Sequence, residues 1–208
     1  MKNLTIAVDG PAGSGKSTIS KKIARELNIV YIDTGAMYRA LTLKILKNGI
    51  SLFDKKELSE TLENTTIDFR DNQIYLDGEK VDEEIRDNRI NTNVSEVAKI
   101  KEVREKLVEI QRNIARNKSV IMDGRDIGSF VLPDASYKFY ITASIEERGY
   151  RRYKELKEKG YDVDLELVID EIRERDRIDS TREISPLVKC DDAIEIDTTD
   201  KTIEEVVS

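Results

Sequence analysis

A glycine-rich segment near the N-terminus is the clearest chemical signal in this sequence. Residues 10–17 read GPAGSGKS and fit the spacing G-x-x-x-x-G-K-[ST] at every fixed position. In this pattern successive backbone amides surround phosphate groups, the lysine reaches the β- and γ-phosphates, and the last hydroxyl binds Mg²⁺. We predict that a nucleotide is bound by Gly10, Pro11, Ala12, Gly13, Ser14, Gly15, Lys16, Ser17 and Thr18.

The flanking sequence decides between this interpretation and an ordinary glycine-rich turn with a solvated lysine. Residues 4–8 form a short apolar run that predicts a buried parallel strand. Residues 16–27 carry Ile19, Ile23 and Leu27 at helical spacing. A helix that opens at Lys16 adds the partial positive charge of its N-terminus to the loop. The context therefore favours a phosphate-binding loop, with Lys16 as a catalytic residue.

The amino-acid composition removes most other catalytic chemistries. The sequence has no histidine and one cysteine, Cys190, for which the neighbouring Val188 and Ala193 predict a buried thiol. Ser-His-Asp and Cys-His catalysis, histidine-ligated zinc and multi-thiolate metal sites are therefore excluded. Carboxylates, lysine, arginine, hydroxyls and backbone amides remain. Phosphoryl transfer from ATP with Mg²⁺ needs only those groups.

Length and charge indicate one soluble domain. The chain has 208 residues, of which 38% are hydrophobic and 37% charged, and its net charge is −7. No apolar stretch approaches the roughly 20 residues of a membrane span, and the N-terminal segment lacks the pattern of a signal peptide. The acidic balance argues against a nucleic-acid-binding surface. We expect a cytoplasmic monomer that binds small-molecule nucleotides and neither nucleic acid nor a membrane.

The remaining sequence alternates predicted strands and helices. Further strands are predicted at residues 30–32, 120–122, 138–141 and 193–197, and helices at residues 37–47, 97–114, 145–159, about 164–178 and after 197. Residues 66–82 break this alternation, because two alternating runs with turn signals at 71–72 and 77–78 predict antiparallel strands. We predict an α/β fold of the three-layer P-loop NTPase type: a parallel central sheet, helices on both faces and a small antiparallel β insert.

Two local patterns bear on helix ends. Ser144 with Glu147 predicts a capping box at the start of the helix over 145–159. At the other end of the chain, residues 180–181 and Pro186 predict that the helix from about 164 stops before Arg182. Arg182 is therefore not expected to share a helix face with the residues that precede it.

Two other classes of P-loop protein are disfavoured. A GTPase usually recognises guanine with N-K-x-D after a strand, but in residues 117–120 Val120 stands where the aspartate is needed. The segment also precedes a predicted strand rather than following one. A nucleic-acid-dependent ATPase, such as a helicase fragment, would need a longer chain and a basic path for the phosphate backbone.

Further segments in chain order narrow the assignment. They are DTGAMYR at 33–39, VSEVA at 94–98 with Val103-Arg104, VIMDGRDIG at 120–128, and RDRIDSTR at 175–182 followed by Ser185-Pro186-Leu187. Together with the P-loop they resemble the bacterial cytidylate kinase family, over about residues 4–198. The resemblance implies direct in-line transfer of a phosphoryl group from MgATP to CMP, and also to dCMP, in pyrimidine nucleotide metabolism.

The resemblance also implies an organisation and a set of site residues. It describes a single domain over 1–208, with a core at about 1–60 and 96–208, an acceptor-binding region with the β insert at about 61–95, and a short lid at about 148–164. The implied catalytic residues are Lys16, Arg125, Arg148 and Arg152. The implied acceptor-binding residues are Thr34, Tyr38, Arg39, Ser95, Arg104, Arg125, Asp126, Arg175, Asp179 and Arg182. Metal binding is assigned to Ser17 and Asp123, directly or through water, with Asp33 in support.

Particular roles follow for the acceptor residues. Cytosine offers an amino donor beside two acceptors, so its recognition takes a carboxylate and cationic or hydroxyl donors, and the resemblance assigns these to Asp126, Arg104 and Ser95. The remaining assignments are Arg175 and Asp179 to the ribose hydroxyls, and Arg39, Arg125 and Arg182 to the acceptor phosphate, where planar bidentate donors suit a dianion.

Several of these residues have purely structural alternatives. Asp33 would cap the turn that follows it. Arg104 would be a solvated helix residue beside Glu102 or Glu105. The remaining alternatives are an exposed ion pair for Arg175 with Asp179, four residues apart, and a solvated helix face for Arg148, Arg151 and Arg152.

Overall fold

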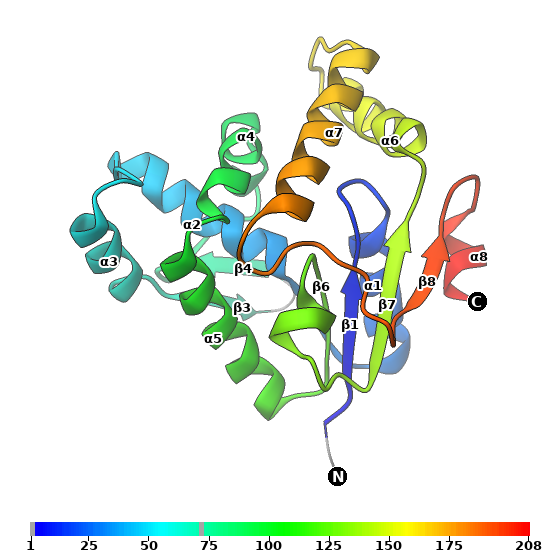
Figure 1. Ribbon diagram of the computed structural model, residues 1–208, viewed down its shortest axis with the longest axis horizontal. Coiled ribbons are helices and arrows are strands. Elements are labelled where there is room, and N and C mark those ends of the chain that lie inside the picture. Colours follow the sequence, from blue (N-terminus) through cyan, green and yellow to red (C-terminus); the bar gives the residue numbers. More distant parts are fainter. Residues whose placement is uncertain (1–2, 71–72) are drawn as a thin grey trace. The chain divides into compact units, whose positions relative to one another are not determined.

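The computed structural model describes residues 3–70 and 73–208 (Figure 1). These residues form two compact units. One, which we call the P-loop unit, comprises residues 3–31 and 119–208 of the described chain, and the other, the inserted unit, lies within residues 32–118. The inserted unit is broader than the acceptor-binding region predicted at about 61–95, because it also takes in residues 32–60 and 96–118.

The P-loop unit is built on a parallel sheet whose central strand is β1 (Thr5–Asp9). The strand order is β2–β6–β1–β7–β8, in which β1 pairs in parallel with β6 and β7, and β7 with β8. The other strands are β2 (Val30–Asp33), which enters this unit through its first two residues, β6 (Val120–Gly124), β7 (Tyr137–Thr142) and β8 (Ile194–Asp197). The predicted parallel sheet is confirmed.

Both faces of this sheet are covered. On one face Val8 and Ile121 belong to a buried cluster that includes side chains of α1 (Lys16–Leu27) and is covered by α8 (Ile203–Val207). On the other face the π-helical turn η2 (Ile127–Val131) lies against β1 and β6 (Figure 1). Strands buried on both faces read as continuous apolar runs, which explains why they were recognisable in the sequence.

Two further helices of the P-loop unit, α6 (Ile145–Glu158) and α7 (Leu165–Thr181), pack side by side (Figure 1). Ser144 caps α6, since its hydroxyl accepts a hydrogen bond from the amide of Glu147 at 3.2 Å. The Ser144 amide donates instead to the Thr199 hydroxyl at 2.9 Å, so the reciprocal half of the predicted capping box does not form.

The end of α7 lies slightly beyond the predicted position, at Thr181 rather than about residue 178. Arg182 follows in an extended conformation, with φ −63° and ψ 143°, while its amide still donates to the carbonyl of Ile178 at 3.1 Å. The prediction that the helix stops before Arg182 is confirmed. The direction of the Arg182 side chain is therefore not set by the helical geometry of α7.

The close approach of α6 and α7 depends on Gly149. A β-carbon at this position would lie 2.3 Å from Cγ1 of Ile169 on α7. We predict that Gly149→Ala lowers the free energy of unfolding by about 1–3 kcal/mol, because the two helices must move apart. Denaturant unfolding measures this. Ile169→Ala removes the obstructing atoms, so the double variant should lose less than the sum of the single losses, and simple additivity would contradict the explanation.

The inserted unit consists of helices and a small antiparallel sheet. Its helices are α2 (Thr34–Asn48), α3 (Lys55–Glu63), the short 3₁₀ helix η1 (Glu84–Arg86), α4 (Asn88–Val97) and α5 (Lys101–Asn117). Its strands are β3 (Ile67–Arg70), β4 (Gln73–Leu76) and β5 (Glu79–Lys80), paired in that order. Leu41, Ile74 and Leu107 are among its fully buried side chains. Across the described residues of both units, no helix combines the length and apolar character needed to cross a membrane.

The predicted antiparallel insert is confirmed in its strands. Residues Asp77 and Gly78 join β4 to β5 with φ values of 50° and 87°, as a tight hairpin turn of type I′ requires. The Asp77 carboxylate also accepts a hydrogen bond from the amide of Thr66 at 2.8 Å, which ties the turn to the start of β3. The turn predicted at Asp71-Asn72 lies outside the described residues.

Helix boundaries in the inserted unit differ from the prediction. Helix α2 begins at Thr34 rather than Met37, because the Asp33 carboxylate caps it. The helix predicted over 97–114 is wrong at its start, since residues 98–100 separate α4 from α5. Helices α3 and α4 themselves lie in stretches where the sequence pattern predicted no helix. Local amphipathicity is weak evidence when a helix has only three turns or fewer.

Candidate active site

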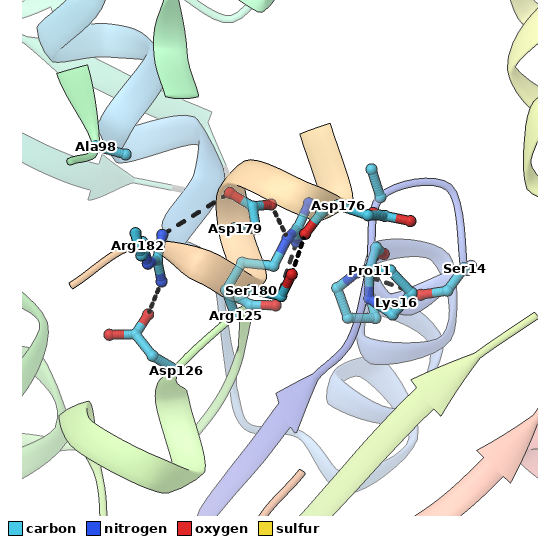
Figure 2. A network of polar contacts seen from close by, with 12 residues as sticks. Pro11, Ser14, Lys16, Ala98, Arg125, Asp126, Asp176, Asp179, Ser180 and Arg182 are labelled. Atoms are coloured by element: carbon cyan, nitrogen blue, oxygen red, sulfur yellow. Dashed lines mark hydrogen bonds and ion pairs between the residues drawn. The ribbon is translucent and has the colours of Figure 1, made fainter. Parts of the chain in front are cut away.

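The P-loop runs from the carboxyl end of β1 to the first turn of α1. Gly10 has φ 148°, and a β-carbon there would lie 1.9 Å from the carbonyl oxygen of Ile141 on β7, so only glycine lets the loop leave the sheet at this point. Lys16 is buried, and its Nζ donates to the carbonyl of Pro11 at 2.6 Å and to the hydroxyl of Ser14 at 3.2 Å (Figure 2). These bonds hold the ammonium group within the loop.

The charge of Lys16 depends on its surroundings. Burial lowers the pKa of Lys16 well below its usual value, and the Arg125 guanidinium lowers it further, whereas Asp123 and Asp9 act in the opposite direction. Anionic phosphates placed against this lysine would stabilise its charged form and restore the pKa. The loop is therefore suited to bind a polyphosphate.

Ser17 and Asp123, both predicted to bind the metal, lie together. The Ser17 hydroxyl at the start of α1 donates to Oδ2 of Asp123, near the end of β6, at 2.5 Å. Both are hard oxygen donors of the kind that Mg²⁺ prefers. Two protein oxygens suit an ion that keeps several waters and is otherwise held by substrate phosphates. The chemistry of this donor set fits Mg²⁺.

Asp33, the third residue assigned to the metal, has a structural role within the inserted unit. Its carboxylate accepts hydrogen bonds from the Ala36 amide at 2.8 Å and from Nη2 of Arg39 at 3.0 Å. The capping alternative is confirmed, and the ion pair additionally holds Arg39, a predicted acceptor residue, at the first turns of α2. A metal role for Asp33 stays a prediction.

Asp9 is an important residue that the sequence analysis did not single out. It is the last residue of β1, and its buried carboxylate accepts hydrogen bonds from the amides of Ile127 at 2.8 Å and Gly128 at 2.7 Å. These bonds attach the segment that follows Arg125 and Asp126 to the strand that leads into the P-loop. The sequence did contain a signal for this role, because Asp9 ends the apolar run of β1 and a carboxylate buried there needs hydrogen-bond partners.

Burial raises the pKa of Asp9 to about 6, although its two amide hydrogen bonds favour the carboxylate. Between the ordinary value near 3.8 and this value, the folded state binds more protons at Asp9 than the unfolded state. The stabilising contribution of Asp9 therefore falls as pH rises through this range, by roughly 3 kcal/mol in total. Carbon-13 NMR of the side-chain carboxyl, assigned with Asp9→Asn, should show a midpoint near 6, and a midpoint below 5 would contradict the prediction.

Four of the predicted acceptor residues form a chain of alternating charges in the P-loop unit (Figure 2). Nη2 of Arg182 donates to Oδ1 of Asp126 at 3.5 Å, and its Nη1 lies 3.9 Å from Oδ1 of Asp179. Nε of Arg125 donates to Oδ2 of Asp179 at 2.8 Å. The structure thus places these predicted acceptor residues, from the loop after β6 and the end of α7, in direct contact.

The environment of Asp179 excludes the surface ion pair considered for it. Asp179 is 5% exposed. Burial by itself would raise its pKa, but Arg125, Arg175 and Arg182 together hold the pKa below its usual value. Arg175, half-buried one turn earlier on α7, is therefore one of three arginines whose charge acts on a buried carboxylate, and not half of an exposed ion pair.

Arg148 is attached to the P-loop. Its side chain is buried, its Nε donates to the carbonyl of Ala143 at 3.0 Å, and its Nη1 donates to the carbonyl of Ala12 at 3.1 Å. The same Nη1 donates to Oδ2 of Asp176 on α7 at 2.6 Å. The alternative of a solvated helix face is therefore wrong for Arg148.

The two other arginines of this group differ from Arg148. Arg151 donates to the carbonyl of Thr198 at 2.8 Å, and the Thr198 hydroxyl donates to the carbonyl of Ser14 at 3.1 Å, so Arg151 supports the P-loop through an intermediary that the sequence analysis did not identify. Arg152 pairs with Glu155 at 2.8 Å, three residues further along α6. That contact matches the helix-face alternative, and a catalytic role for Arg152 stays a prediction.

The Arg148–Asp176 pair should matter for stability because both side chains are largely removed from water, at 7% and 22% exposure. We predict that Asp176→Asn lowers the free energy of unfolding by about 2 kcal/mol, since it leaves a buried guanidinium with weaker compensation. Asp170→Asn on the same helix is a matched control. Asp170 pairs with Arg173 in solvent, and its loss should cost less than about 1 kcal/mol. Equal losses in the two variants would contradict the prediction.

Arg104 is the most buried cation in the inserted unit's described residues, at 1% exposure. Its Nη1 donates to the carbonyl of Ala98 at 3.2 Å, and its guanidinium carbon lies 5.5 Å from the ring centroid of Tyr38, in cation–π range. The alternative of a solvated residue beside Glu102 or Glu105 is wrong. Burying an arginine costs free energy, so its burial here favours a binding role.

The other predicted acceptor residues of the inserted unit lie on α2 and α4. Thr34 and Tyr38 are buried in the first turns of α2, next to Arg39. Ser95 is half-buried on α4, a helix that packs against α2. The inserted unit therefore carries hydroxyl and guanidinium donors on adjoining helices.

Comparison with known proteins identifies the family. The cytidylate kinase family profile matches residues 6–208. The chain belongs to the cytidylate kinase family. A cytidylate kinase of Clostridioides difficile (strain 630) is 64% identical, with all of this chain and 96% of that protein covered. A cytidylate kinase of Alkaliphilus oremlandii is 58% identical, with coverage of 100% and 95%. The family resemblance drawn from the sequence motifs is confirmed.

A solved structure supports the fold. An uncharacterized protein from Eubacterium ventriosum ATCC 27560 superposes with a TM-score of 0.55, covering 99% of this chain and 94% of that one. The two sequences are only 15% identical, so the similarity concerns the fold alone. Within the cytidylate kinase family, the roles of individual residues in this chain rest on the contacts described above.

Proposed function

We infer that this chain phosphorylates CMP, with ATP as the phosphoryl donor, by direct in-line transfer. The observation that carries the inference is the match to the cytidylate kinase family over residues 6–208, in a chain whose P-loop keeps every fixed position. The absence of histidine from the sequence accords with a reaction that relies on positioning and electrostatics rather than on a histidine base.

In this proposal the P-loop binds the phosphoryl donor, ATP. Residues 10–18 would surround the ATP phosphates with backbone amides, and Lys16 would contact the β- and γ-phosphates. Arg148 bonds to the loop at Ala12, which places its guanidinium beside the loop where we propose that it stabilises charge on the transferred group. We assign the same role to Arg125 and, from α6, to Arg152.

Mg²⁺ would be held by the Ser17 hydroxyl and, directly or through water, by Asp123, with Asp33 as the further residue proposed for its surroundings. When bound, the ion neutralises charge shared by the β- and γ-phosphates. Asp123 is buried and already oriented by Ser17, so the chain presents the ligand without reorganising it.

The acceptor would be recognised by its three parts. Cytosine would be bound by Asp126, Arg104 and Ser95. The ribose would be bound by Arg175 and Asp179, and the phosphate by Arg39, Arg125 and Arg182. Further contacts are proposed for Thr34 and Tyr38. Uracil reverses donor and acceptor at two ring positions, so buried polar groups matched to cytosine would be left unpaired by UMP. We extend the proposal to dCMP as a second acceptor, and to a monomer that acts in the cytoplasm, apart from nucleic acid and membranes.

A coupled assay of ADP release tests the acceptor assignment. With MgATP, turnover should be fastest on CMP and dCMP among a panel that also contains UMP, AMP and GMP. Faster turnover on AMP or GMP would refute the acceptor while leaving the kinase assignment intact. ATP binding without turnover on any of these nucleotides would indicate a regulatory P-loop protein instead.

The proposed role of Asp126 in base recognition can be tested by comparing CMP turnover with ATP binding. We predict that Asp126→Ala lowers kcat/KM for CMP by about 100-fold, because a charge-assisted hydrogen bond to the base is lost, and leaves the Kd for ATP within about threefold. Steady-state kinetics and isothermal titration calorimetry measure the two quantities. Equal losses for CMP and ATP would contradict a specific role in base recognition.

A further inference from the structure

Asp123 is held from two sides. While Ser17 on α1 donates to Oδ2 at 2.5 Å, the hydroxyl of Tyr31 on β2 donates to Oδ1 at 3.0 Å. A carboxylate bonded at both oxygens by groups from different elements cannot turn about its Cβ–Cγ bond without breaking one of the contacts. The orientation of Asp123 is therefore set by Tyr31 as well as by Ser17.

Tyr31 is itself fixed by packing. The residue is 4% exposed and belongs to the buried cluster that contains Val8, Ile19 and Ile121. A side chain locked in this way can hold its hydroxyl at one point, which a solvated donor could not do. Packing alone would be satisfied by phenylalanine or an aliphatic residue. The hydroxyl of a buried tyrosine, by contrast, costs free energy unless it is hydrogen-bonded, and here it donates to Asp123.

We propose that Tyr31 is a positioning residue that orients Asp123 toward the metal ion of the nucleotide complex. This inference rests on the proposed metal role of Asp123. Groups that hydrogen-bond to a metal ligand set its direction, and their loss typically lowers metal affinity about 10- to 100-fold. Tyr31 does not touch the nucleotide in this proposal; it acts only through the carboxylate.

The test compares nucleotide binding with and without the metal. A non-hydrolysable ATP analogue is titrated into each protein by calorimetry, once with Mg²⁺ and once with excess chelator, and the ratio of the two Kd values gives the metal-dependent gain. For Tyr31→Phe the metal-free Kd should stay within about twofold of the wild type, while the gain should fall about tenfold. Activity at saturating CMP should require correspondingly more free Mg²⁺.

Two further variants make the result interpretable. Tyr137→Phe removes a phenol hydroxyl from an exposed residue of β7 and should leave both Kd values unchanged. Asp123→Asn should lose the metal-dependent gain to at least the extent seen for Tyr31→Phe. Thermal unfolding of each variant confirms that the comparison is made between folded proteins.

The outcomes separate this inference from the proposed function. If Asp123→Asn loses the gain and Tyr31→Phe keeps it, the positioning role is refuted and the metal role of Asp123 stands. If Asp123→Asn also keeps the gain, the proposed metal role is wrong and the inference fails with it. If Tyr31→Phe weakens binding equally with and without Mg²⁺, the hydroxyl serves only the local structure, and the inference is again refuted.

Discussion

Two hydrogen bonds from backbone amides to the carboxylate of Asp9 hold the functional edge of the P-loop unit together. They join the end of β1 to the start of η2, at 2.8 Å from Ile127 and 2.7 Å from Gly128. The residue after Asp9 begins the P-loop, and the residues before Ile127 are Arg125 and Asp126. The P-loop and two residues that we propose for acceptor binding are thus carried on segments fixed to one buried carboxylate. Ligand sites of parallel sheets generally form at such carboxyl ends, where neighbouring connections leave in opposite directions.

At this edge, arginines that are largely removed from water are paired with carboxylates. Arg125 and Arg182 contact Asp179, Arg182 also contacts Asp126, and Arg148 contacts Asp176. A buried guanidinium without such a partner would cost several kcal/mol. The carboxylates therefore make it possible to bury planar, bidentate donors of the kind that bind phosphate dianions. The residues that we propose for nucleotide binding thus also hold one another through ion pairs.

The helix starts illustrate how side-chain contacts alter a sequence prediction. In the segment DTGAMYR the helix was predicted to begin at Met37, yet α2 begins at Thr34 because Asp33 caps it and pairs with Arg39. For Ser144, only half of a predicted capping box forms, since the Thr199 hydroxyl takes the amide that Glu147 would have bonded. At Ser144 the deciding partner is a side chain 55 residues away in the sequence, so the local pattern could not reveal it.

Sequence alone was sufficient for the P-loop, the parallel sheet, the antiparallel insert and the family, because each depends on local periodicity or on residues at fixed spacing. It also led to most of the proposed site residues, through the family resemblance. It could not reveal the contacts of Asp9, Tyr31, Asp176 and Thr198, or show that Arg104 and Arg148 are buried while Arg152 pairs along its own helix. Those features depend on which side chains from distant parts of the chain meet, and on how fully water is excluded around them. Only the tertiary structure determines both.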